Sequence, residues 1–214
     1  MLDFTTSRSK IHQIAFDAAD CDVVLRTVDD ERLRVHRRIL QEASPFFSDL
    51  FSLPQPPSDN NEDPPIIDVE ENAGLMKTLL SLVYPGPEPE IDTLDELSAL
   101  LVAAMKYQLI RAVDALRRLL ITPEFVEKHP TRVYAIACRH DLDEEARVAS
   151  KYTLNINVLD CPLTDDLKYI SAFAYHRLLD LHRKRGQAAQ ALLVCEDDVK
   201  VSNVFLHYRH LLGR

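Results

Sequence analysis

Histidine and cysteine are the residues in this sequence best suited to hold a metal or to act as nucleophiles. The cysteines lie far apart and form no CxxC pair; they are Cys21, Cys138, Cys161 and Cys195. His207 and His210 have an i, i+3 spacing, but no cysteine or acidic ligand lies close to them in the sequence. Because four-coordinate zinc sites usually draw on closely spaced ligands, we expect no metal site. Isolated cysteines of this kind are typical of reduced thiols in an intracellular protein.

Motifs for catalysis are also absent from the sequence. It contains no GxSxG, no glycine-rich phosphate loop and no HExxH. The carboxylates cluster in the proline-rich segment 54–65, which is a poor place to hold two acidic groups in a fixed geometry. We therefore predict no catalytic residues, no cofactor and no enzymatic activity.

One histidine lies where the sequence pattern changes, in the stretch LRVHRRILQEASPFFSDLF (33–51). A strand-like alternation precedes His36, and a helical apolar spacing follows it. An imidazole at such a junction can fill apolar space while its ring nitrogens bond to nearby backbone groups. We interpret His36 as a structural residue that joins a hairpin to helices, rather than as a catalytic or metal-binding residue.

Composition and charge exclude several classes of partner. The chain has 25 basic and 34 acidic residues, a net charge of −9, so general binding to a polyphosphate such as nucleic acid is disfavoured. The longest apolar run, 99–105, is too short to span a membrane, and the N-terminus lacks the apolar core of a secretory signal. The one dense basic run, 182–185, is interpreted as a solvated helix face rather than a nuclear-localisation or nucleic-acid signal. We expect a soluble intracellular protein of the nucleus or cytoplasm.

The elements that must position these residues follow the order β-β-α-α-β-α-α-α. Segments 22–28 and 32–36 are predicted to form a hairpin, and 66–69 a third short strand. Ser44 and Pro45 form a helix start signal, a capping hydroxyl followed by a proline at the first helical position. Beyond residue 122 we expect only helices, including one long helix over 165–193 with Gly186 as a weak point. The fold class is therefore α+β, with helices covering a small sheet.

With these elements, CDVVLRTV and RLRVHRRILQEASPFFSDLF resemble the BTB (POZ) domain family. The positions that match the family pattern are Asp22, Val23, His36, Arg37, Ile39, Leu40, Ser44, Phe46, Phe47, Leu50 and Phe51. The resemblance implies a BTB domain over 19–122, with a small three-stranded sheet covered by helices. Residues 1–18 would form a tail or short helix. Residues 123–214 would form a helical C-terminal extension, as in fungal members of the family.

The resemblance also implies a function and an interface. In dimeric members, an aspartate and a base at the positions of Asp22 and Arg37 line a charged pocket between subunits; two solvated surface charges are the alternative. The implied function is protein–protein interaction through homodimers or BTB heterodimers, supporting scaffold assembly and transcriptional regulation. The alternative is a substrate adaptor of a cullin-based ubiquitin ligase. For that role Leu53, Pro54 and Gln55 are only a near miss to the apolar-x-Glu motif of adaptors.

Overall fold

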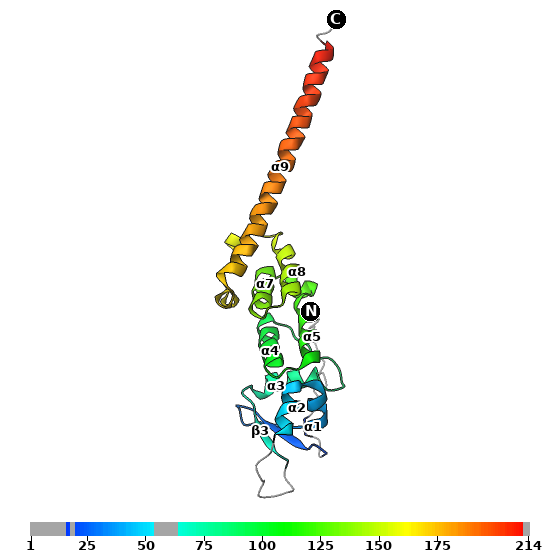
Figure 1. The fold of residues 1–214 in the computed structure, drawn as a ribbon, viewed down its shortest axis with the longest axis vertical. Coiled ribbons are helices and arrows are strands. Elements are labelled where there is room, and N and C mark those ends of the chain that lie inside the picture. The colour runs from blue at the N-terminus through cyan, green and yellow to red at the C-terminus, as the bar shows by residue number, and fades with distance from the viewer. Residues whose placement is uncertain (1–15, 18–19, 54–63, 212–214) are drawn as a thin grey trace, which may run out of the picture. The chain divides into compact units, whose positions relative to one another are not determined.

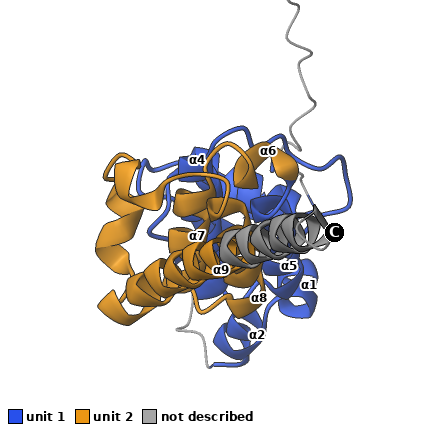
Figure 2. Ribbon diagram, turned by 90° about the horizontal axis from the view of Figure 1, so that it is seen from above, with its two compact units in different colours: residues 1–122 blue, residues 123–214 orange. Residues whose placement is uncertain are grey.

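The computed structural model describes residues 16–17, 20–53 and 64–211, with the backbone alone from 193 onward (Figure 1). Most of the expected tail at 1–18 and most of the proline-rich segment 54–65 lie outside the described residues. The chain forms two compact units, Met1–Thr122 and Pro123–Arg214 (Figure 2). The first contains a small sheet and helices, and the described part of the second is helical, which confirms the predicted α+β class.

The sheet has three strands in the order β2-β1-β3. They are β1 (Val23–Arg26), β2 (Arg32–Val35) and β3 (Ile66–Asp68). β1 pairs antiparallel with β2 and parallel with β3. Because β1 is central, three of its four residues are buried, whereas β2 alternates exposed arginines with buried Leu33 and Val35. The predicted hairpin and third strand are present, and each strand is shorter than its predicted range.

The helices of the first unit pack their apolar faces around this sheet. They are α1 (Arg37–Ala43), α2 (Pro45–Ser52), α3 (Ala73–Ser81), α4 (Leu94–Lys106) and α5 (Ile110–Leu120). Leu40 of α1, Phe47 of α2 and Leu97 of α4 are almost completely buried. Burial of such large apolar side chains supplies most of the free energy that holds the helices to the sheet.

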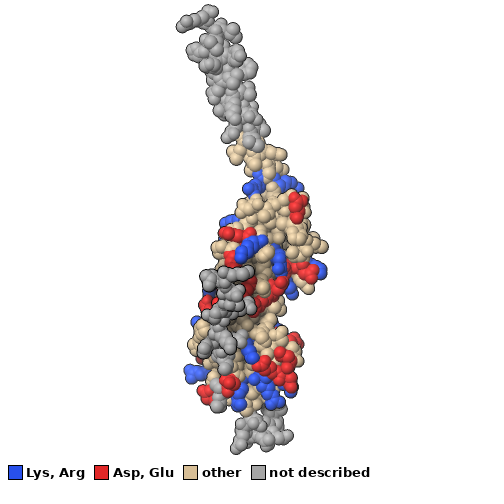
Figure 3. Space-filling view, turned by 180° about the vertical axis from the view of Figure 1, so that it is seen from behind, with Lys and Arg blue, Asp and Glu red and all other residues tan. Residues whose placement is uncertain are grey.

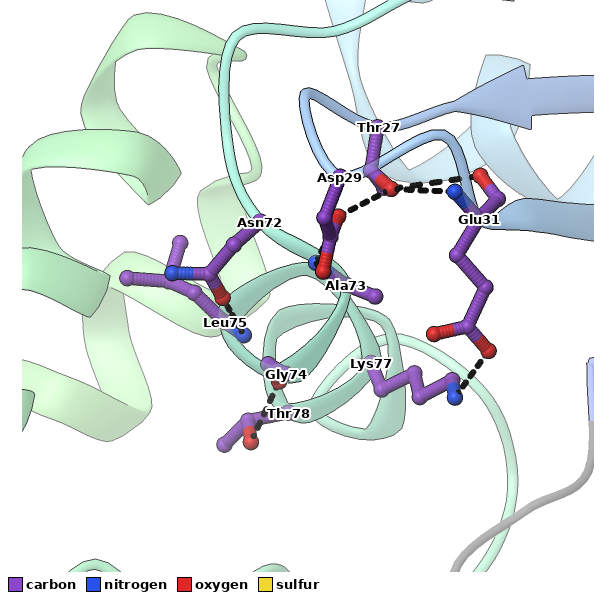
Figure 4. Close-up of polar contacts among 9 residues, drawn as sticks. All are labelled: Thr27, Asp29, Glu31, Asn72, Ala73, Gly74, Leu75, Lys77 and Thr78. Carbon is purple, nitrogen blue, oxygen red and sulfur yellow. Dashed lines mark hydrogen bonds and ion pairs between the residues drawn. The ribbon is translucent and has the colours of Figure 1, made fainter.

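The hairpin turn is fastened to the start of α3 (Figure 4). Asp29 accepts hydrogen bonds from the Thr27 hydroxyl at 2.5 Å and from the backbone N–H of Ala73 at 3.0 Å. Lys77 of α3 forms an ion pair with Glu31 at the other end of the turn. The hydrogen bond from Thr27 lowers the pKa of the Asp29 carboxyl. The turn therefore holds a charged carboxylate against a helix N-terminus, where the helix dipole favours it.

The second unit consists of helices and short helical turns. They are α6 (Pro123–Val126), α7 (Pro130–Arg139), α8 (Asp143–Thr153), η1 (Val158–Asp160), η2 (Asp165–Tyr169) and α9 (Ala172–Leu211). The Tyr134 hydroxyl donates to the carbonyl of Ala174 at 2.7 Å, and Arg132 pairs with Asp166 at 2.6 Å. These contacts join α7 to η2 and to the first turn of α9.

The prediction of one continuous helix over 165–193 is wrong at its start. Asp165–Tyr169 is a separate 3₁₀ turn, and Ile170 is extended, with φ −92° and ψ 153°. The Ser171 side chain then accepts from the backbone N–H of Ala174 at 3.1 Å, which caps the new helix. Gly186 does not interrupt α9, since one helical glycine costs only about 1 kcal/mol. Among the described helices, none is both long and apolar enough to cross a membrane.

Candidate functional site

Asp22 and Arg37, the two predicted interface residues, lie at the junction of β1 and α1. Asp22 immediately precedes β1, and its Oδ1 accepts a hydrogen bond from the backbone N–H of Arg37 at 2.6 Å. His36, at the N-cap position of α1, makes no side-chain capping bond. Asp22 therefore satisfies a free amide at the start of α1 from a position 15 residues away in the sequence.

The guanidinium of Arg37 lies over the ring of Phe51, with Cζ 4.9 Å from the ring centroid. This is the geometry of a cation–π contact over the face of a ring that is only 7% exposed. The contact that joins Asp22 to Arg37 thus runs through the backbone, while the Arg37 charge contacts Phe51. Their role in a subunit interface stays a prediction.

His36 is half-buried at the end of β2, and both its ring and its backbone N–H contact side chains. Its backbone N–H donates to the Tyr84 hydroxyl at 2.8 Å, and Nδ1 lies 3.3 Å from the same oxygen. Its Nε2 lies 3.5 Å from Oδ1 of Asp20. His36 is placed between hairpin and helices, but its ring nitrogens face a phenol and a carboxylate rather than the backbone groups that we expected.

Tyr84 is the partner that sequence reasoning missed, because the adjacent prolines made it look like a simple helix terminator. Its ring packs edge-on against Phe16 with centroids 5.3 Å apart. Burial raises the pKa of Tyr84 to about 12, so the hydroxyl is protonated at neutral pH. An aromatic residue with a hydroxyl was visible at this position in the sequence. The sequence did not indicate its partner, because His36 is 48 residues away.

Ser44 connects α2 to the end of α4. As predicted, it caps α2: its Oγ accepts from the backbone N–H of Phe47 at 3.1 Å. The same hydroxyl donates to the carbonyl of Tyr107 at 2.6 Å, and the residue is completely buried. One side chain therefore satisfies two backbone groups that would otherwise be buried without partners.

The remaining motif residues lie in the core or at its edge. Val23 and Leu40 are both 0% exposed, and Leu50 is half-buried. Phe47 stacks on Tyr107 at 5.6 Å, and half-buried Phe46 meets the same ring edge-on at 5.5 Å. The residues of the family-like pattern in this stretch thus serve to pack the fold, and their contacts do not indicate a catalytic role.

Charges on the described surface are mixed in sign. Figure 3 shows Lys and Arg interspersed with Asp and Glu on the face drawn. In the basic run, Arg183 and Lys184 pair with Asp180 at 2.6 and 2.8 Å. Residues 183–185 are solvent-exposed and partly neutralised, in agreement with the interpretation as a solvated helix face, whereas His182 is half-buried and contacts the Thr153 hydroxyl.

One group of side chains in the described residues combines the donor types of a metal site. A carboxylate oxygen of Asp20, the sulfur of Cys21 and a ring nitrogen of His36 all lie within 4.8 Å of one another. Cys21 is a free thiol and is buried. Asp20 and Cys21 precede β1 and His36 follows β2, so the antiparallel pairing of the two strands brings these three donors together.

Comparison with known proteins gives one finding for the first unit. The family model described as BTB/POZ domain matches residues 15–124, more than half of the 214-residue chain. A search of curated proteins found no match.

Proposed function

Because this chain belongs to the BTB/POZ domain family, whose domain is a protein–protein interaction module, we propose that it acts as a dimerising scaffold. The family match carries the proposal, and it confirms the resemblance seen in the sequence. In this proposal the BTB domain pairs with a second copy or with another BTB domain, in the service of scaffold assembly and transcriptional regulation. The helical extension at 123–214 would select a further partner.

The surface proposed for pairing is the β1–α1 junction, defined by Asp22, Arg37 and the exposed neighbour Arg38. A two-fold interface places one patch against an identical copy, so the patch must be complementary to itself. An acidic and a basic residue side by side meet this requirement, since each can face its opposite on the other subunit. The second carboxylate oxygen of Asp22 gives that side chain acceptor capacity beyond its bond to α1.

The solution mass of the whole chain tests this proposal. Light scattering at roughly 50 μM, far above the nanomolar dissociation constants of stable dimers, should give the mass of a dimer. Asp22→Asn, which keeps an oxygen to cap α1 but removes the charge, should weaken the dimer, and Asp22→Lys should weaken it further. Arg111→Gln, at an exposed basic position on α5 outside this surface, is the matched control.

A monomeric wild type under these conditions would contradict self-pairing. A dimer that is unchanged by both Asp22 substitutions would leave pairing intact but exclude this surface. A heterodimer would be identified by mixing the chain with other BTB domains and measuring the mass again.

The cullin adaptor is the second candidate. One observation favours it: Leu53, the apolar residue of the near-miss motif, is 59% exposed at the end of α2. Pro54 and Gln55 lie outside the described residues. Stable co-purification of the recombinant chain with a cullin N-terminal domain, abolished by Leu53→Asp, would support this role, and failure to bind would exclude it.

We also propose that the chain has no catalytic role and works in the nucleus or cytoplasm. The interaction-module character of the domain and the free thiols of Cys21, Cys138 and Cys161 support this reading. Its partners would be proteins, without a nucleic acid or a membrane.

A further inference from the structure

We propose that Asp20, Cys21 and His36 form a Zn²⁺ site at the base of the β1–β2 hairpin. Asp20 and Cys21 lead into β1, and His36 follows β2 directly. Their donor atoms lie within 4.8 Å of one another. This site does not depend on the proposed dimer. It differs from the expectation of no metal site, because that expectation was based on ligands that are close together in the sequence.

The donor set suits zinc. Zn²⁺ accepts thiolate sulfur, imidazole nitrogen and carboxylate oxygen together, whereas Mg²⁺ and Ca²⁺ prefer oxygen alone. With metal–ligand bonds of about 2.0–2.3 Å, tetrahedral ligands lie roughly 3.5 Å apart. His36 Nε2 and Asp20 Oδ1 are already 3.5 Å apart. The side chain of Asp20 is 81% exposed, so it can move without disturbing the core.

Tyr84 orients the histidine for this role. Metal-binding histidines usually hold the second ring nitrogen in a hydrogen bond that fixes the ring. Here the Tyr84 hydroxyl lies 3.3 Å from Nδ1 and accepts from the His36 backbone N–H at 2.8 Å. The remaining nitrogen, Nε2, is the one that faces Asp20, and Phe16 packs edge-on against the Tyr84 ring.

The electrostatic surroundings favour a cation. Asp20 and Asp22 directly flank Cys21 in the sequence. Two carboxylates beside one buried sulfur create a negative site that a divalent ion would neutralise. When Zn²⁺ binds, the Cys21 S–H bond breaks, the S–Zn bond forms, and the proton leaves to solvent.

Such a site would have three protein ligands and one position for water. It would tie the segment that enters β1 to the point where β2 passes into α1. Without a cation, the contact between His36 and exposed Asp20 is of a kind that contributes little to stability. A metal would make the same residues a fixed crosslink beside Asp22 and Arg37.

Cobalt titration of the whole reduced chain tests the site. Co²⁺ substitutes for Zn²⁺ and reports a cysteine ligand through a thiolate-to-cobalt charge-transfer band. The band should grow up to one equivalent of Co²⁺ and disappear when Zn²⁺ is added. It should be lost in Cys21→Ser, and Asp20→Asn should weaken binding roughly tenfold or more.

The controls use the same residue types at other positions. Cys161→Ser removes another free thiol, and Asp17→Asn removes a nearby carboxylate that is outside the donor set. Both should bind Co²⁺ with the wild-type spectrum and stoichiometry. Circular dichroism checks that each variant is folded, and the exposed position of Asp20 keeps that variant informative if Cys21→Ser unfolds.

The proposal is overturned if the wild type shows no charge-transfer band, or if the band persists in Cys21→Ser, because another thiol then binds the metal. Equal affinity in Asp20→Asn and the wild type would also overturn the three-ligand site.

Discussion

The carboxylate of Asp22 accepts a hydrogen bond from the backbone N–H of Arg37 at 2.6 Å, and so connects the entry to β1 with the first turn of α1. Asp22 and Arg37 are therefore joined by a hydrogen bond to the backbone, in addition to carrying opposite side-chain charges. Asp22 has one role that depends on an acceptor oxygen and a second, proposed role that depends on charge. Substitutions can separate the two.

The capping role of Asp22 predicts a difference between two substitutions in the unfolding free energy. Asp22→Ala removes the acceptor and should lower it by about 1 kcal/mol. Asp22→Asn keeps an oxygen at the same place and should lower it by much less. Urea denaturation followed by circular dichroism measures both. Equal losses in the two variants would show that charge, rather than the cap, stabilises this junction.

Ser44→Ala should lower the unfolding free energy by about 2 kcal/mol. The substitution removes the α2 cap and leaves the buried Tyr107 carbonyl without its donor. Ser52→Ala is the control, since Ser52 is exposed at the end of the same helix and donates to the Asp49 carbonyl. That variant should stay within about 0.5 kcal/mol of wild type in the same denaturation experiment. A loss no larger than the control's would mean that water replaces Ser44.

The aromatic contacts predict unequal costs for two adjacent phenylalanines. Phe47 is 1% exposed and stacks on Tyr107, so Phe47→Ala should cost about 3–5 kcal/mol. Phe46 is half-buried, and Phe46→Ala should cost clearly less because water can fill the space that it leaves. Thermal unfolding of the two variants gives the order. The reverse order would contradict this assignment of the core.

The hydrogen bond from Thr27 to Asp29 predicts a pH dependence. Because the pKa of Asp29 is lower in the folded chain than in the unfolded one, its contribution to stability is present above the unfolded value of about 3.9. This contribution to stability is lost as the pH falls through the lower pKa that Asp29 has in the folded chain. Thr27→Val removes the donor at nearly constant volume, so its stability difference from wild type should shrink between pH 7 and pH 3.

Thr78→Val serves as the control for this pH dependence. The Thr78 hydroxyl donates to the Gly74 carbonyl at 3.1 Å, and no titrating group is involved in that bond. Its stability difference from wild type should be the same at both pH values. A Thr27→Val difference that is equally constant would show that the turn does not hold the Asp29 carboxylate in its charged form.

Sequence patterns predicted the local structure of this protein well where the determining contacts are close in the chain. The Ser44–Pro45 start of α2 depends on a hydroxyl and an amide three residues apart. The alternation of β2 depends on the two faces of one strand. The start of α9 was missed, because the Ser171 cap lies within a stretch of continuous helical propensity and carries no strong signal of its own.

Tertiary structure alone decided which distant side chains meet. Asp20 precedes the first strand of the hairpin and His36 follows the second, yet their side chains are in contact. Tyr84 contacts His36 although 48 residues separate them in the sequence, and Ser44 contacts Tyr107 across 63 residues. Residue types at these positions were visible, but each contact depends on how strands and helices pack. Local propensity acts over a few residues, whereas a hydrogen bond or a metal site needs atoms within a few ångströms, and only the folded core brings distant segments that close.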